Sequence, residues 1–142
     1  KSNKEMKKRD RNYLIIFLVI ILIFAGYLFI KKSNVKAYKY VKQNTFPQDT
    51  LPEGIYSGTF NAYNIEFAKV EFLIQNGEIN SFKIPKVIHA PWTKVRSAVM
   101  DSIQTKNTLN FDAVTGATGS SFYIKAAIHK AIKKSKKDSL SD

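Results

Sequence analysis

The chain has 142 residues and a net charge of +12, from 23 Lys and Arg against 11 Asp and Glu. This length predicts a single folded domain with attached segments. The sequence contains no Cys and only two His, which excludes disulfides, thiolate metal sites and a Cys nucleophile, and argues against a metal centre built from His.

The first predicted element is a transmembrane helix at residues 13–30, YLIIFLVIILIFAGYLFI, which contains no charged residue. As a helix, these residues would be about 27 Å long, close to the roughly 30 Å hydrocarbon core of a bilayer. No small-x-small cleavage motif follows, so we expect an uncleaved single-pass anchor rather than a signal peptide. Basic residues flank both ends in similar number, so charge does not orient the span.

The segments around this anchor predict the domain organisation. Residues 1–12 are a basic arm, residues 31–50 are a basic and polar linker, residues 51–137 are the folded domain, and residues 138–142 are a tail. The excess Lys lies beside the anchor and in the last turns of a C-terminal helix, where cations also offset the helix dipole. It is not interleaved with aromatic residues, so we expect anionic lipid head groups and no nucleic acid as the charged partner.

Three strands open the predicted domain. Small or apolar residues alternate with polar ones over residues 55–62 and 66–74, and an Asn-Gly pair then gives the strongest short signal for a hairpin turn. Residues 79–84 return as the third strand, which Pro85 is expected to end. These elements predict an antiparallel meander.

Two helices follow. Pro91 suits the first position of a helix, and an apolar stripe at helical spacing follows it, at Trp92, Val95, Val99 and Ile103. The second helix is expected from about Ser120 to Lys136. Strands followed by helices, without βαβ alternation, predict the α+β class: a small antiparallel sheet with two packed helices, preceded by one N-terminal transmembrane helix.

The stretch that carries chemistry is DAVTGATGSS, at residues 112–121. It is a loop of small residues before the last helix, and its Gly residues permit close backbone approach. Hydroxyl groups and the free N–H groups of a helix start are the ligands that hold a phosphate, although the pattern lacks the GK[ST] ending of a P-loop. Spacing alone favours a simpler interpretation, a helix start capped by Ser or Thr.

The same stretch resembles the signature of the FMN-binding domain family, Asp-x-x-Ser/Thr-Gly-Ala-Thr. This family includes the flavin-carrying C subunit of the sodium-pumping NADH:quinone oxidoreductase and the G subunit of the Rnf complex. Residues 54–58 are similar to its opening Gly-x-Tyr-x-Gly, and the likeness runs through the hairpin and the last helix over roughly residues 52–134. Where many members carry Thr-Ser, this chain has Ser120-Ser121.

The resemblance implies FMN as the cofactor, attached by a phosphoester to Thr118 after transfer from FAD by a dedicated flavin transferase. Some members hold FMN without the covalent link, so both modes of binding stay open. The other cofactor-binding residues that we expect are Asp112, Thr115, Gly116, Ala117, Ser120, Ser121, Trp92 and His89. Among aromatic side chains, Trp92, Tyr123, Phe122 and Tyr56 are candidate platforms for the flavin ring, with core packing as the alternative for each.

The predicted function is that of a membrane-anchored flavoprotein that carries electrons between redox partner proteins. No residue is assigned to catalysis, because the chemistry belongs to the cofactor. Family members of this plan usually hold the domain on the extracytoplasmic side of the cell membrane. The alternative is a scaffold subunit of a membrane redox complex that has the fold without the flavin.

Overall fold

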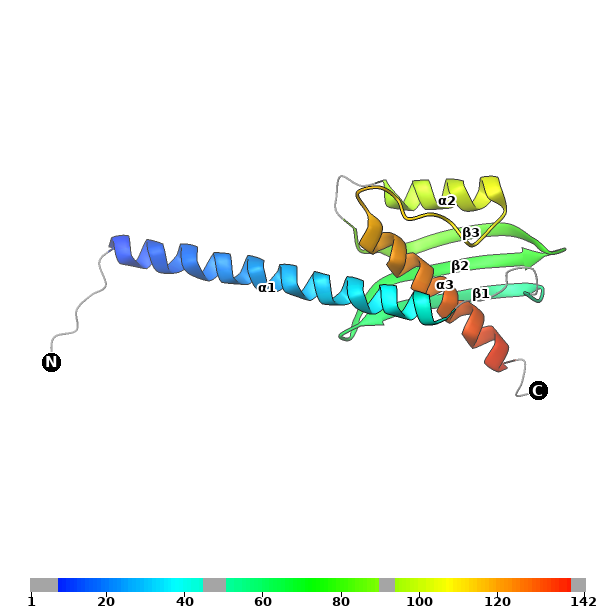
Figure 1. The fold of residues 1–142 in the computed structure, drawn as a ribbon, viewed down its shortest axis with the longest axis horizontal. Helices are drawn as coiled ribbons and strands as arrows, with labels where there is room; N and C mark the ends of the chain where they lie inside the picture. Colours follow the sequence, from blue (N-terminus) through cyan, green and yellow to red (C-terminus); the bar gives the residue numbers. More distant parts are fainter. Residues whose placement is uncertain (1–7, 45–50, 90–93, 139–142) are drawn as a thin grey trace. The chain divides into compact units, whose positions relative to one another are not determined.

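The structure is a computed structural model, and it describes residues 8–44, 51–89 and 94–138. The chain forms two compact units, residues 1–33 and residues 34–142. In order along the chain, the elements are α1 (Lys8–Gln43), β1 (Gly54–Ala62), β2 (Ile65–Gln75), β3 (Glu78–Val87), α2 (Val95–Lys106) and α3 (Thr118–Asp138), as drawn in Figure 1.

The first unit consists, in its described part, of the apolar portion of α1. From Tyr13 to Ile30 the large apolar side chains of this helix are exposed, except for the half-buried Phe29. Among the described residues, α1 is the one helix long and apolar enough to cross a membrane. Such a surface is expected of a helix whose solvent is lipid, because apolar side chains are otherwise buried.

The helix α1 continues beyond the apolar run to Gln43, so most of the segment predicted as a linker is helical. Residues 31–43 contain no Gly or Pro that would stop a helix, and the next Pro in the chain is Pro47. Residues 45–50 lie outside the described residues. The division into arm, anchor, linker, domain and tail stays a prediction.

The second unit is built on an antiparallel sheet with strand order β1-β2-β3. Both hairpins have two-residue turns with positive φ at both positions: Tyr63 and Asn64 in the first, and the predicted Asn76 and Gly77 in the second. Such turns match the twist of the flanking strands. The α+β class and the predicted meander are therefore confirmed.

The predicted end of the third strand at Pro85 was wrong, because β3 continues to Val87. Glu71 pairs with Lys83 and Lys69 pairs with Lys86, so β3 holds one extra residue in a bulge around Pro85. Since β3 is an edge strand, a residue without an N–H is tolerated there.

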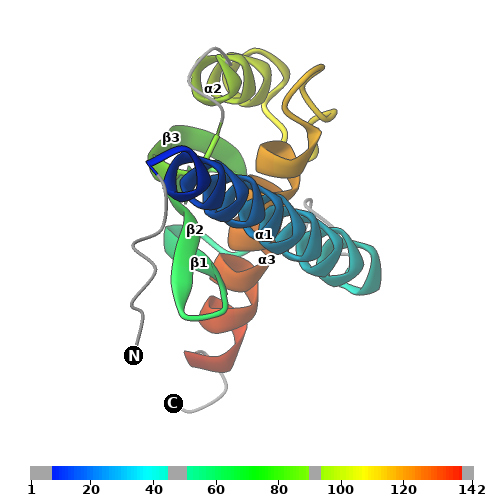
Figure 2. The same ribbon diagram turned by 90° about the vertical axis from the view of Figure 1, so that its left-hand side faces the viewer.

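One face of the sheet carries the core. Along β1 and β2 the side chains on this face are buried, and α3 packs against both strands while α2 packs against β3, as Figures 1 and 2 show. The apolar stripe of α2 is confirmed at Val95, Val99 and Ile103. The predicted start of this helix at Pro91, with Trp92, lies outside the described residues.

The core is closest where α3 crosses β1 at Gly58. A Cβ atom at Gly58 would lie within 3.0 Å of the Ala127 carbonyl oxygen and the Ala131 nitrogen, both backbone atoms of α3. This close approach gives a physical reason for the second Gly in the Gly-x-Tyr-x-Gly pattern.

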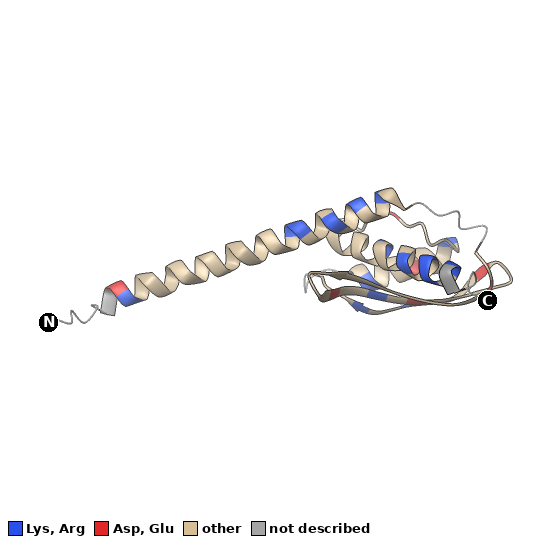
Figure 3. Ribbon diagram, turned by 90° about the horizontal axis from the view of Figure 1, so that it is seen from below, with Lys and Arg blue, Asp and Glu red and all other residues tan. Residues whose placement is uncertain are grey.

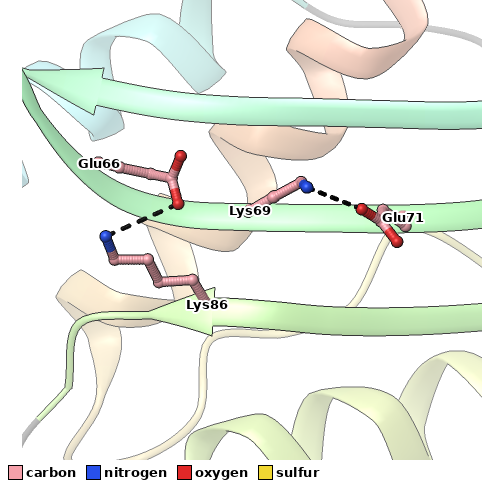
Figure 4. Close-up of polar contacts among 4 residues, drawn as sticks. All are labelled: Glu66, Lys69, Glu71 and Lys86. Atoms are coloured by element: carbon pink, nitrogen blue, oxygen red, sulfur yellow. Dashed lines mark ion pairs between the residues drawn. The ribbon is translucent and has the colours of Figure 1, made fainter.

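The other face of the sheet is open and polar. Two ion pairs lie on it, Lys69 with Glu71 at 2.9 Å and Lys86 with Glu66 at 3.7 Å (Figure 4). Because these side chains are partly exposed, each pair contributes about 1 kcal/mol or less to stability.

The last turns of α1 belong to the second unit and pack on α3. Ala37 is fully buried, and the rings of Tyr38 and Phe122 meet edge to face at 5.1 Å. The Tyr123 hydroxyl donates a hydrogen bond to Asn34 Oδ1. These contacts make residues 34–43 part of the folded domain rather than a bare tether.

Candidate functional site

A tight turn leads into α3 and sets its first residue. The Ala117 N–H donates to the Val114 carbonyl at 2.9 Å, and Gly116 between them has φ +77°. This geometry is typical of a type II turn, which favours Gly at that position. The Ala117 carbonyl then accepts the first helical hydrogen bond, from the Ser121 N–H at 2.9 Å.

Consequently α3 begins at Thr118, and the predicted start at Ser120 was two residues late. The prediction relied on the preference of Ser and Thr for the capping position. Ala117 occupies that position instead, because the turn at Gly116 determines where the helical conformation starts.

The hydroxyls of Ser120 and Ser121 do not cap the helix, contrary to our prediction. Ser121 is fully buried, and its Oγ accepts from the Val114 N–H and donates to the Ala117 carbonyl, both at 3.0 Å. Ser120 Oγ donates to the Ile88 carbonyl at 2.9 Å. One hydroxyl therefore fixes the turn, and the other ties α3 to the chain just after β3.

The hydroxyls of Thr115 and Thr118 differ from these, because both threonines are exposed. Thr118 is the first residue of α3, where the N–H groups of the first turn have no partner within the helix. The dipole of this 21-residue helix adds roughly half a positive charge at the same end. An exposed hydroxyl thus lies at a helix start that favours an anion.

The other motif residues surround this start. Asp112 and Gly116 are exposed, whereas Ala117 is buried. A Cβ atom at Gly116 would meet nothing within 4 Å, so this Gly serves the turn and leaves open space in front of the loop. The binding roles predicted for these residues stay predictions.

A cation that the sequence analysis missed lies against the motif. Lys125 Nζ is 5.1 Å from the ring centroid of Phe111 and 5.8 Å from that of Phe122. Burial lowers the pKa of Lys125, and the neighbouring Asp112 carboxylate partly opposes this shift. Lys125 lies seven residues after Thr118, so the two residues lie on one side of a helix. This spacing is the sequence signal that could have indicated Lys125 as a site residue.

Two of the four candidate aromatic platforms belong to the core. Tyr56 stacks on Phe72 at 4.9 Å with its ring nearly parallel, and its hydroxyl donates to the Pro52 carbonyl. Tyr123 is also buried, and burial raises its pKa to about 12. Both rings therefore follow the core-packing alternative.

The remaining ring candidates are placed as follows. Phe122 is half-buried on α3, beside Lys125. His89 is half-buried and directly follows Ile88, whose carbonyl accepts the Ser120 hydroxyl, so the chain brings His89 to the start of α3. Trp92 lies outside the described residues. No group of three or more metal-ligating side chains occurs in the part of the chain that the structure describes.

Fold and site together define a small α+β domain that presents a threonine hydroxyl at a helix start. A family model described as the FMN-binding domain matches residues 30–133, more than half of the chain, and the chain therefore belongs to the FMN-binding domain family. This membership identifies a flavin-binding protein with FMN as its cofactor. No curated protein and no solved structure matches the chain.

The matched region begins within α1 and includes the last turns of that helix. It also contains the Gly-x-Tyr-x-Gly strand, the hairpin and the motif before α3. The extent of the match agrees with the packing of residues 34–43 on α3, which places those turns inside the domain. The more specific likeness to individual subunits of redox complexes stays a prediction.

Proposed function

We propose that this protein is a membrane-anchored flavoprotein electron carrier, with FMN attached by a phosphoester to Thr118. One observation supports it above the others. Of the hydroxyls in the motif, that of Thr118 is both exposed and located at the first residue of α3. In a chain of the FMN-binding domain family, this is the position that the family motif assigns to the flavin linkage.

The residues around Thr118 fit a phosphate group. The N–H groups of the first turn and the helix dipole favour the negative charge that a phosphodiester keeps. Lys125, whose pKa the Asp112 carboxylate raises in part against the effect of burial, adds a positive charge on the same helix. The open space at Gly116 leaves the Thr118 backbone approachable by a flavin transferase, which would form the Thr118 O–P bond as AMP leaves FAD.

Four residues of the motif have a role in this proposal. Thr118 Oγ holds the phosphate, Gly116 and Ser121 hold the turn that presents it, and Asp112 orients the loop through Lys125. When bound, FMN supplies one- and two-electron transfer, while the protein binds and orients it. His89, Phe122 and Trp92 are the residues from which the surroundings of the ring would come.

The membrane part of the proposal is supported by the exposed apolar surface of α1. Anchoring by this helix would raise the effective concentration of the flavin near its redox partner proteins in the membrane. We place the domain on the extracytoplasmic side, as in family members of this plan. After membrane extraction, we expect the intact mass to be that of a chain that still contains residues 13–30. A chain cleaved after residue 30 would make this helix a signal sequence instead.

Intact mass and peptide mapping after co-expression with a flavin transferase test the linkage. We expect an FMN-sized addition on the peptide that contains Thr118, absent in Thr118→Ala and retained in Thr118→Ser. The matched control is Thr115→Ala, which removes the neighbouring exposed hydroxyl and is expected to leave the addition in place.

The other outcomes separate the alternatives. A yellow protein without a mass addition, whose colour leaves on denaturation, would contradict the phosphoester and keep FMN as a non-covalent cofactor. A colourless protein without an addition would contradict the flavin carrier and favour the scaffold subunit.

A further inference from the structure

A surface rich in lysines extends over two helices of the second unit. We define this two-helix basic surface by six residues: Lys36, Lys39 and Lys42 on α1, and Lys130, Lys133 and Lys134 on α3. Spacings of three and four residues keep each set on one side of its helix. Figure 3 shows Lys and Arg residues in blue on the last turns of α1 and on α3.

Packing brings the two helices together at Lys36 and Lys130, although the two sets are about ninety residues apart in the chain. Tyr38 meets Phe122 edge to face, and Lys130 Nζ lies 5.7 Å from the ring centroid of Tyr40. Burial lowers the pKa of Lys130, and the positive charge of Lys36 lowers it further, so the two ammonium groups lie near each other.

No carboxylate whose side chain the structure describes pairs with these lysines. Residues 31–48 and 113–137 contain no Asp or Glu. In the part of the chain that the structure describes, none of the six lysines forms an ion pair, whereas Glu66 and Glu71 are paired with lysines on the open face of the sheet. Like charges held together repel, so this surface is stabilised by an anionic partner.

The position of the surface in the chain favours lipid as that partner. The apolar run of α1 ends at Ile30, and Lys36 lies six residues further along the chain. Two more lysines, Lys31 and Lys32, lie between them. Clusters of four to eight basic residues on the cytoplasmic side of a transmembrane helix bind anionic head groups, and the same electrostatic attraction acts at any leaflet that contains anionic lipid. The alternative partner, an acidic protein, has no such link to the apolar segment.

We propose that the two-helix basic surface binds the anionic head groups of membrane lipids and holds the flavin domain against the bilayer surface. This inference rests on the proposed anchoring by α1. It adds that the lysines of α3, far from the anchor in sequence, contact the same membrane and restrict the orientation of the domain.

The chain has no Cys, so a single introduced Cys is the only site that a thiol-reactive label can modify. Ser135→Cys, next to Lys134 on α3, would carry a fluorophore in the full-length chain. The chain is reconstituted into phosphatidylcholine vesicles with or without ~30% phosphatidylglycerol, and energy transfer to a rhodamine-labelled head group reports the distance to the bilayer.

We expect phosphatidylglycerol to increase the energy transfer, and about 0.5 M NaCl to reverse the increase by screening. Each lysine near an anionic surface is worth roughly fivefold in binding, so replacing Lys130, Lys133 and Lys134 by Gln should lower the ratio of docked to undocked domain by ~100-fold. Because Lys130 is half-buried, the exposed pair Lys133→Gln/Lys134→Gln serves as a second variant, expected to lower it by ~25-fold.

The matched control replaces Lys83, Lys94 and Lys106 by Gln, which removes the same charge from exposed positions on or next to β3 and α2. This control should keep the increase. Energy transfer that is equal in neutral and anionic vesicles, or that the α3 variants leave unchanged, would overturn the proposal and favour an acidic protein partner.

Flotation of the same samples distinguishes this proposal from the anchoring. Chain that floats with neutral vesicles supports the anchor. Chain that floats only with anionic vesicles, and does so through the α3 lysines, would contradict the anchor and still support the basic surface. Chain that floats with neither would contradict both.

Discussion

The start of α3 has two sides that carry the same chemical group for different purposes. On the inner side, Ser120 and Ser121 use their hydroxyls within the protein, to the chain after β3 and to the turn. On the outer side, Thr115 and Thr118 are exposed. The comparison teaches that burial decides which hydroxyls of such a motif hold the fold and which can contact a ligand. The sequence motif alone does not show this difference.

The largest expected effect comes from a substitution at Gly58, where α3, the helix that carries the inner side, packs closely on β1. Gly58→Ala would drive a Cβ atom into backbone atoms of α3, which cannot move without lifting the helix from β1. We expect a loss of about 3 kcal/mol in the free energy of unfolding, measured by urea denaturation. Ser57→Ala, at an exposed position of the same strand, is the control and should change it by less than about 0.5 kcal/mol. Equal stabilities would contradict the close approach.

Ser121→Ala tests the inner side directly. It leaves the part-buried N–H of Val114 without its acceptor, so we expect a loss of about 1–3 kcal/mol in unfolding free energy. Hydrogen exchange at the Val114 amide should speed up by a matching factor. An unchanged exchange rate at this amide would show that the turn is held by other contacts.

Gly116→Ala tests the turn that separates the two sides. The φ of +77° at this position costs a residue with a Cβ about 1 kcal/mol, although space for the methyl group is available. We therefore expect a small loss of stability in urea denaturation. An Ala variant as stable as the parent would mean that the turn does not need the positive φ.

The last effect is confined to alkaline pH and concerns Tyr123, which is buried in the core on α3. Its pKa of about 12 in the folded protein exceeds the ordinary value of 10.0, so the unfolded chain loses this proton first. Between pH 10 and 12 the folded state then holds more protons, and stability falls as pH rises. Tyr123→Phe should show a shallower fall over this range in thermal melts. Parallel pH profiles for the two proteins would contradict a raised pKa.

Much of the sheet could be predicted, because its signals are local. Asn76-Gly77 tolerates the positive φ that a two-residue hairpin needs, and the alternation of β1 and β2 follows from a single buried face. The first hairpin turn, Tyr63-Asn64, was missed because a Tyr at positive φ has no favourable local signal. Pro85 remained within a strand because β3 lies at the edge of the sheet, which only the topology reveals.

The site was predicted in composition more than in arrangement. The motif identified Thr118 and Gly116, but local preferences placed the helix start at Ser120, because they do not include the turn that makes Ala117 the capping residue. The contact of Lys125 with Phe111 depends on the packing of a loop against α3. The composition of residues 31–43, which lack Gly and Pro, permits a helix, but it does not show that Ala37 is buried against the domain.

The central claim is that the outer hydroxyl serves the flavin and the inner one serves the fold. The most direct measurement compares Thr118→Ala with Ser121→Ala, scoring covalent flavin on denaturing gels and unfolding free energy on flavin-free protein. We predict that Thr118→Ala loses the flavin and keeps its stability within about 0.5 kcal/mol, while folded Ser121→Ala keeps the flavin and loses about 1–3 kcal/mol. Covalent flavin on Thr118→Ala, or a loss of stability equal to that of Ser121→Ala, would contradict the account.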